Sequence, residues 1–300
     1  MTGNAAAYSI TYAAGGIAKA IGAKARRALL EEVYTTPKPG LVDLYSCGAH
    51  DDMDVRTFEK SAEALYPYFV RMAEQGYLLR CTPEALFSEI RKTGIEAEQA
   101  MYRATDGVNT HKGLIFTIGI FSAAAGRCMR ENGKITARDL ADMQIQMTGR
   151  ILQKEIKAIG RKKAGSHGER NLQKYGTAGI RGEALAGYPG IWNLALPVLQ
   201  AGIRERRDWN RVKLQTFFVL MEGIEDSNIL ARNNPAVLEE VQREAGSFLQ
   251  KGGAYGENAI EKLCRMDGEY IRRNISAGGC ADLLAAAVFI EMLLNGTAFK

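Results

Sequence analysis

The chain has 300 residues, 46% of them hydrophobic and 24% charged, with 39 basic against 34 acidic residues and a net charge of +5. This composition excludes an intrinsically disordered chain and provides enough apolar residues for a sizeable core. The basic excess is mild and forms no basic run or aromatic-interleaved basic stripe, which argues against a nucleic-acid partner and suits an anionic small molecule.

The first 18 residues carry no charge and lack the basic start of a signal peptide, so we expect a loose N-terminal arm over residues 1–18. No Pro-, Gly- or Ser-rich linker divides the rest of the chain, which predicts a single helical catalytic domain over residues 19–300. The sequence is compatible with a homo-oligomer but does not specify one.

No membrane partner is expected, because prolines 189 and 197 interrupt the longest uncharged stretch, between Glu183 and Arg204. The five cysteines are odd in number, widely spaced and without a CxxC pair. They indicate neither a disulfide framework nor a zinc site, which favours the reducing cytoplasm.

Apolar residues recur at helical spacing along almost the whole chain, and strand alternation is scarce. The pattern predicts an all-α fold, a single multi-helix bundle with its active site on the connecting loops. The expected helices cover, in order, residues 17–33, 58–69, 83–101, 110–128, 137–160, 192–204, 210–221, 235–250, 256–273 and 280–295.

The first loop of interest, residues 34–53, contains two prolines and two glycines beside Lys38, Asp43, His50, Asp51 and Asp52. Proline fixes φ and glycine permits unusual φ, so this loop can hold charged side chains still for a ligand.

The second loop ends in Asn109, Thr110, His111, Lys112 and Gly113 and runs directly into an apolar helix. Free backbone N–H groups and the positive dipole end of that helix attract anions, which makes this segment the strongest phosphate-site candidate. In the alternative, Asn109 or Thr110 only caps the helix, and His111 and Lys112 lie on a solvated first turn.

Two further loops have a similar composition. Residues 165–190 hold seven glycines, with Arg181 suited to phosphate oxygens and Glu183 suited to bind Mg²⁺ or act as a general base. In residues 225–235, Asp226 and Asn228 offer oxygen ligands to a hard cation. The alternatives are a solvated surface loop with an Arg–Glu pair for the first, and helix capping for the second.

Taken together, these segments resemble the triphosphoribosyl-dephospho-CoA synthases, which serve citrate lyase and malonate decarboxylase. The resemblance rests on residues 37–43 (Pro-Lys-Pro-Gly-Leu-Val-Asp), 48–53 (Gly-Ala-His-Asp-Asp-Met), 109–113 (Asn-Thr-His-Lys-Gly), 181–184 (Arg-Gly-Glu-Ala), 226–228 (Asp-Ser-Asn), 278–279 (Gly-Gly) and 281–284 (Ala-Asp-Leu-Leu). Ser227, the pair Asn233 and Asn234, and Ala277 depart from the usual family residues.

The resemblance implies an all-helical transferase that joins ATP to 3′-dephospho-CoA. It would release adenine and leave a triphosphoribosyl group on the 2′-hydroxyl of the acceptor ribose, giving a precursor of an acyl-carrier prosthetic group. Breaking a ribose–adenine bond passes through an oxocarbenium-like state, so a phosphate anchor, a base for the hydroxyl and help for the departing adenine are needed.

On this basis we assign hypothetical roles. The catalytic candidates are Asp52 or Glu183 as the base, with His50 orienting or protonating. The metal candidates are Asp226 and Asn228, which would hold Mg²⁺. The nucleotide and phosphate candidates are Lys38, Asn109, Thr110, His111, Lys112, Gly113, Arg181, Gly182 and Arg232.

Two other classes of function stay open from the sequence. One is a different phosphoribosyl or nucleotide-hydrolysing enzyme on the same helical frame, and the other is a non-catalytic nucleotide-binding module. Free adenine that depends on dephospho-CoA would indicate the transferase, and ADP would indicate a hydrolase. ATP binding without any product would indicate the module.

Overall fold

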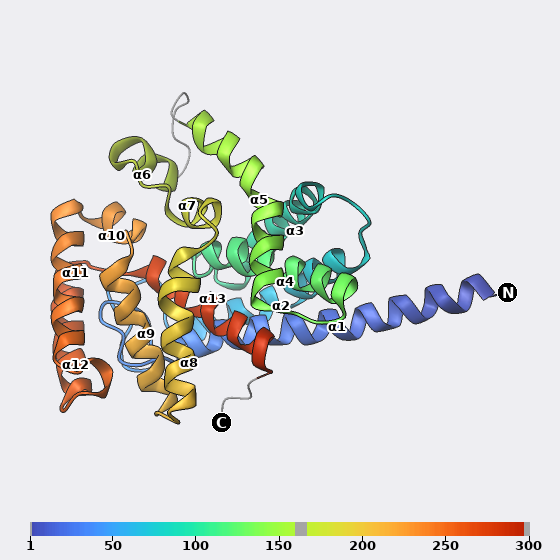
Figure 1. Cartoon of the computed structure of the whole chain (residues 1–300). Coiled ribbons are helices and arrows are strands. Elements are labelled where there is room, and N and C mark those ends of the chain that lie inside the picture. The colour runs from blue at the N-terminus through green and yellow to red at the C-terminus, as the bar shows by residue number, and fades with distance from the viewer. Residues whose placement is uncertain (1, 160–166, 297–300) are drawn as a thin grey trace.

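The computed structural model describes residues 2–159 and 167–296, which are helical with no strand. The predicted all-α fold is confirmed (Figure 1). Its elements are α1 (Thr2–Val33), α2 (Val55–Leu78), α3 (Pro83–Ala104), α4 (Lys112–Asn132), α5 (Ala137–Ile159), α6 (His167–Tyr175), α7 (Gly179–Leu185), the π-helix η1 (Gly190–Ala195), α8 (Leu196–Arg204), α9 (Trp209–Gly223), α10 (Ser227–Arg232), α11 (Pro235–Gln250), the 3₁₀ turn η2 (Gly253–Tyr255), α12 (Ala259–Arg272) and α13 (Gly278–Asn295).

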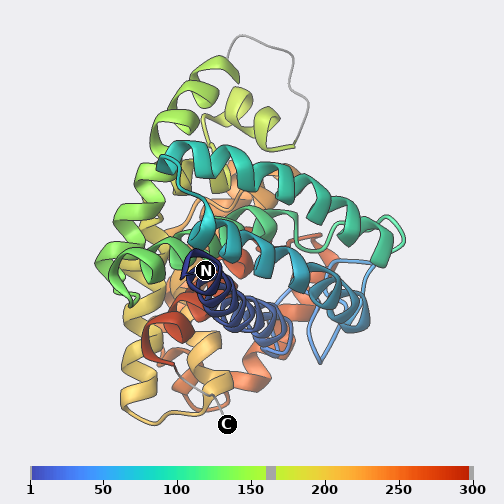
Figure 2. The same ribbon diagram turned by 90° about the vertical axis from the view of Figure 1, so that its right-hand side faces the viewer.

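The N-terminal segment differs from the expected loose arm, because α1 is already helical at Thr2. Its alanine-rich sequence favours helix, and Ala14 and Ala18 are fully buried, so packing holds the helix well before residue 19. The first part of α1 extends away from the other helices (Figure 1), and Figure 2 looks along it. The division of the chain into an arm and a single domain stays a prediction.

Two helices form the centre of the core. Most of α4 and nearly all of α13 are buried, and both sequences are apolar on every side, as expected of helices surrounded by others. Both are long and apolar enough to cross a membrane, but 78% and 72% of their apolar windows are buried inside this fold. Helices α1, α2 and α8 pack around them, so the N-terminal ends of α4 and α13 are fixed from several directions.

The glycine-rich stretch predicted as one loop over residues 165–190 instead carries α6 and α7. Gly176, Gly179 and Gly187 have positive φ values of 77°, 52° and 83°. Gly176 follows α6, Gly179 is the first residue of α7, and Gly187 lies two residues after the end of α7. These glycines therefore separate helices, while the residues between them keep helical conformation. Residues 165 and 166 lie outside the described part of the chain. The loop predicted over residues 225–235 likewise contains α10.

Candidate functional site

One large cavity, of about 1520 Å³, opens where the predicted loops meet. Its wall includes His50, Lys112, Glu183 and Asp226, which come from four segments far apart in the sequence. The predicted convergence on a single pocket is therefore confirmed, whereas the role of each residue stays a prediction. The other predicted site residues that line the cavity are Asp52, Asn109, Thr110, His111, Gly113, Arg181, Gly182, Asn228 and Arg232.

The N-termini of the two central helices meet at this cavity. Lys112 and Gly113 begin α4, and Gly278 and Gly279 begin α13, and all four residues line the wall. The N-cap residue of neither helix forms a side-chain cap, but Asn109 Oδ1 accepts the Lys112 N–H at 3.3 Å and Asp226 Oδ2 accepts the Cys280 N–H at 2.8 Å. The other N–H groups of each first turn are left for a ligand. The positive dipole ends of two buried helices thus face one space, which favours a strongly anionic ligand.

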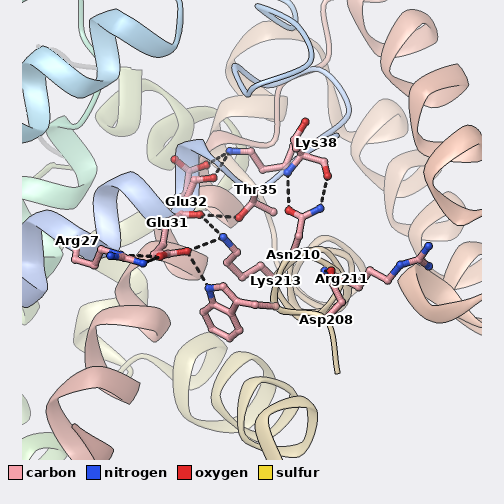
Figure 3. A network of polar contacts seen from close by, with 11 residues as sticks. Arg27, Glu31, Glu32, Thr35, Lys38, Asp208, Asn210, Arg211 and Lys213 are labelled. Atoms are coloured by element: carbon pink, nitrogen blue, oxygen red, sulfur yellow. Dashed lines mark hydrogen bonds and ion pairs between the residues drawn. The ribbon is translucent and has the colours of Figure 1, made fainter. Parts of the chain in front are cut away.

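Lys38 is an exception among the predicted phosphate ligands, because it is not among the residues that line the cavity. Its side chain is fully buried, and Nζ donates to the carbonyl oxygen of Glu32 at 2.7 Å and to the Glu32 carboxylate (Figure 3). Its backbone N–H donates to the Asp43 carboxylate. A buried ammonium needs such partners, so Lys38 fastens the first loop to the end of α1. This position does not support the predicted phosphate contact.

The first loop is held in shape by two glycines with positive φ, as the sequence predicts. Gly40 has a φ of 73°, and a Cβ there would lie 2.1 Å from the carbonyl oxygen of Ile275. Gly48 has a φ of 58°, and a Cβ there would lie 2.5 Å from the backbone of Leu41. Only glycine fits this tight fold, which directs the following His50 toward the cavity.

His50 lies in a polar corner with Arg232. An Nη2 hydrogen of Arg232 points at His50 Nδ1 across 3.1 Å, so Nε2 carries the ring proton and donates to Ser276 Oγ at 3.1 Å. Burial and the positive charge of Arg232 lower the pKa of His50. The carboxylate of Asp52, whose Oδ1 lies 3.9 Å from His50 Nδ1, has a smaller effect that raises it. A neutral His50 suits orientation of a ligand better than protonation of one.

A chain of three polar side chains joins α2 to the start of α4. Thr110 Oγ1 donates to Ser61 Oγ at 2.8 Å, which leaves the Ser61 hydroxyl hydrogen for His111 Nδ1 at 2.6 Å. The proton of His111 is thereby assigned to Nε2, which has no hydrogen-bond partner among the described residues. Burial, with a smaller effect of Lys38, lowers the pKa of His111 to about 3. His111 is therefore a neutral donor, and the alternative of a solvated first-turn histidine is wrong.

We expect Ser61→Ala to lower kcat/KM by roughly tenfold, because His111 Nδ1 loses the hydrogen bond from the Ser61 hydroxyl and the Nε2–H form is no longer favoured. Side-chain ¹⁵N NMR should show the two His111 tautomers becoming mixed. Ser122→Ala is the matched control, since the Ser122 hydroxyl is also buried but has no partner among the described residues. An unchanged His111 spectrum in the Ser61 variant would contradict the assignment.

Two carboxylates lie deep in the cavity wall. Burial raises the pKa of Glu183, although its Oε2 accepts the N–H of Gly190 at 3.1 Å. Asp282 packs so closely on α4 that a Cβ on Gly113 would lie 2.0 Å from its Oδ2. Burial, then the negative charges of Glu32 and Asp226, raise the pKa of Asp282 well above its usual value.

The raised pKa of Asp282 makes its ionised form a cost to folding, so we expect Asp282→Asn to stabilise the protein at alkaline pH. Below the pKa of an unfolded aspartate, about 3.9, the wild-type side chain is neutral in both states and the two proteins should be equally stable. The difference should grow as the pH rises from that value to the folded-state pKa, reaching roughly 1 kcal/mol. Urea denaturation at pH 3 and pH 8 measures it. A variant that is less stable at pH 8 would show that Asp282 is paired.

Both carboxylate oxygens of Asp226 accept hydrogen bonds from backbone N–H groups. Oδ1 accepts the N–H groups of Asn228 and Ile229 at 2.7 and 3.2 Å, and Oδ2 accepts that of Cys280 at 2.8 Å. The capping alternative is therefore confirmed for Asp226, which joins α10 to the start of α13. Among the described residues no group of three His, Cys, Asp or Glu side chains is placed to hold a metal ion. The Mg²⁺ role stays a prediction.

Sequence reasoning missed several of these residues. Ser61 lies inside a predicted helix and Ser276 just before the Gly278-Gly279 pair, and only the fold brings them to His111 and His50. Asp282 was visible in the segment Gly-Gly-Cys-Ala-Asp, but its small residues are equally typical of helix packing. A carboxylate one turn into a predominantly apolar helix is the signal that could have found it.

The sequence comparisons agree with this site. The family model described as ATP:dephospho-CoA triphosphoribosyl transferase matches residues 18–299. A relative from Klebsiella pneumoniae, named 2-(5''-triphosphoribosyl)-3'-dephosphocoenzyme-A synthase, is 38% identical over 274 residues, which cover 91% of this chain and 90% of the relative. A Vibrio cholerae relative whose name adds the qualifier "probable" is 39% identical over 276 residues, covering 92% and 88%. No solved structure matches the chain significantly.

Proposed function

The chain belongs to the ATP:dephospho-CoA triphosphoribosyl transferase family, and on that premise we propose that it makes 2′-(5″-triphosphoribosyl)-3′-dephospho-CoA, the precursor of the citrate lyase prosthetic group, from ATP and 3′-dephospho-CoA. In this reaction the bond between C1′ and N9 of ATP breaks, and the 2′-hydroxyl oxygen of the acceptor ribose bonds to C1′. The hydroxyl proton passes to a base, and adenine leaves with a proton.

The observation that carries this proposal is the meeting of anion-attracting and acidic groups in one cavity. The N-termini of α4 and α13 with Lys112, Arg181 and Arg232 supply positive charge on the wall, and Glu183 and Asp282 supply carboxyl groups. The volume of about 1520 Å³ exceeds the usual range for one drug-sized ligand, which suits two nucleotide substrates held side by side.

Glu183 fits the base better than Asp52. Its raised pKa brings it closer to neutrality, where a general base is most effective, whereas Asp52 has a side chain that is 56% exposed. Asp282, whose pKa is also raised, is suited to donate a proton to the departing adenine. His111 and His50 would donate neutral N–H groups and help to orient the substrates.

The residues present fit a magnesium ion that enters with ATP. Mg²⁺ keeps several waters and needs only one or two protein oxygens when phosphates supply the rest, so Asp226 and Asn228 could complete its shell without a preformed cage. When bound, the ion would neutralise charge on the triphosphate. We place the reaction in the cytoplasm, in keeping with five free cysteines.

Mass spectrometry of the protein incubated with ATP and dephospho-CoA tests the proposal. The expected products are free adenine, formed only when dephospho-CoA is present, and dephospho-CoA enlarged by a triphosphoribosyl group. Release of ADP would indicate a nucleotide-hydrolysing enzyme instead. Calorimetric binding of ATP with no product of either kind would indicate a nucleotide-binding module.

A further inference from the structure

The cavity extends well beyond the predicted loops, along one face of α3. Seven α3 residues line it, at the spacings of three, four and seven that put side chains on one side of a helix. They are Phe87, Ile90, Arg91, Gly94, Ile95, Glu98 and Tyr102. Phe87 and Tyr102 are 15 positions apart, which corresponds to about 22 Å of helix at 1.5 Å per residue. The site is therefore elongated, with one end far from the phosphate-binding loops.

The two ends of this wall differ in chemistry. Near Tyr102, Lys112 of α4 pairs with Glu98 beside the proposed phosphate region. Farther along the wall, apolar side chains that are not fully buried come from α3, α4 and α5. These are Ile95, Phe116, Ile156 and Ile159. Phe116 packs against Phe87, with ring centroids 6.2 Å apart, and Ile156 follows Glu155, which pairs with Arg91.

Ile95 is the most exposed large apolar residue of the described chain, at 61%. A lone exposed isoleucine is ordinary, but one that joins a continuous apolar wall inside a substrate cavity indicates a ligand surface. Between α3 and α5, Arg91 and Glu155 form an ion pair in the cavity wall, so neither charge is left unpaired there.

We propose that this apolar end binds the pantetheine arm of 3′-dephospho-CoA, while the triphosphate of ATP occupies the loop end. The inference rests on the proposed function. Of the two substrates, only the acceptor has a long uncharged arm, with dimethyl, methylene and amide groups, and such an arm gains from apolar contact. ATP is charged at the end opposite its base and would gain little from this wall.

The assignment explains how the enzyme can tell its acceptor from the abundant adenine nucleotides. ADP has the same adenosine and diphosphate as dephospho-CoA but lacks the arm. Contacts along α3 and α5 would then supply the difference in affinity, whereas contacts to adenosine and phosphates could not.

Steady-state kinetics of Ile95→Asp and Ile156→Asp test the inference. We expect the KM for dephospho-CoA to rise at least tenfold in each variant, with the KM for ATP changed less than twofold. In the wild type, kcat/KM for ADP as acceptor should be at least 100-fold lower than kcat/KM for dephospho-CoA. In the variants, these two kcat/KM values should lie closer together. Ile271→Asp, at a residue that is 40% exposed on α12 and not among the residues that line the cavity, is the matched control and should match the wild type.

The outcomes separate this inference from the proposed function. If the wild type forms no triphosphoribosyl product, the proposed function fails and the inference fails with it. If the wild type is active but both variants keep the KM for dephospho-CoA, or raise the KM of both substrates equally, only the inference is overturned. The same holds if the wild type uses ADP as well as dephospho-CoA. Thermal unfolding of the variants should resemble that of the wild type, because Ile95 is exposed and Ile156 partly exposed.

Discussion

Glu183→Gln should lower turnover by about 10²- to 10⁴-fold while leaving ATP binding intact, the range expected for loss of a general base. Glutamine keeps the shape of the side chain and an oxygen that can accept the N–H of Gly190, so the cavity wall should not change. It cannot take a proton from the acceptor hydroxyl. The loss should therefore appear in kcat, measured as adenine release, and not in the affinity for ATP.

Asp52→Asn is the matched comparison, since Asp52 was the other base candidate and lines the same cavity. We expect it to lower turnover less than tenfold, because its side chain is largely exposed and lies at the rim beside His50. A larger loss in the Asp52 variant than in the Glu183 variant would reverse the assignment.

The pH profile gives a second measurement of the same residue. A base must be ionised to accept a proton, and burial raises the pKa of Glu183. The acid side of the kcat profile should therefore fall at a higher pH than the value of about 4.3 for a free glutamate. Glu183→Gln should remove this acid limb from the residual activity. An acid limb that persists unchanged would assign it to another group.

Much of the fold could be predicted because most helices carry strong local signals. Pro83 after the N-cap Thr82 marks the start of α3, and the Pro-Lys-Pro segment follows the end of α1. The short helices α6, α7 and α10 were missed, since glycine and capping residues predict turns and only tertiary contacts make such short helices stable.

The members of the site could be predicted more fully than their chemistry. The motifs predicted one shared site for His50, Lys112, Glu183 and Asp226, and all four residues line one cavity. Burial, which sequence does not reveal, then decided what several residues can do. Burial keeps His111 neutral. In the buried Asp226, the carboxylate accepts the N–H of Cys280 and so joins α10 to α13. Burial also draws Lys38, the first of the predicted phosphate-binding residues along the chain, into an internal ion pair.

The same kind of burial makes Glu31 important for stability. Its carboxylate accepts Arg27 Nε at 2.7 Å, Trp209 Nε1 at 2.8 Å and Lys213 Nζ at 2.8 Å (Figure 3). Burial alone would raise the pKa of Glu31, but the charge of Lys213 and these hydrogen bonds hold it below its usual value. The network ties the end of α1 to α9, next to the Glu32–Lys38 pair that anchors the first loop.

Glu31→Ala should lower the free energy of unfolding by about 3 to 5 kcal/mol at pH 7, because the Lys213 ammonium, 3% exposed, loses its carboxylate partner. Since the folded-state pKa of Glu31 is lowered, its contribution is present above the pKa of an unfolded glutamate and disappears as the pH falls through the folded-state value. The difference between variant and wild type should therefore shrink in acid. Urea denaturation at pH 7 and pH 4 measures both.

The double variant Glu31→Leu with Lys213→Met distinguishes loss of a favourable pair from exposure of a buried charge. If the cost of Glu31→Ala comes mainly from an unpaired Lys213, removing both charges should cost less than removing Glu31 alone, because apolar side chains of similar size can fill the space. If the double variant is instead as unstable as the single one, the network itself supplies the stability, through Arg27 and Trp209 as well. A cost below 1 kcal/mol for Glu31→Ala would contradict both explanations and show that water reaches Lys213 when its partner is removed.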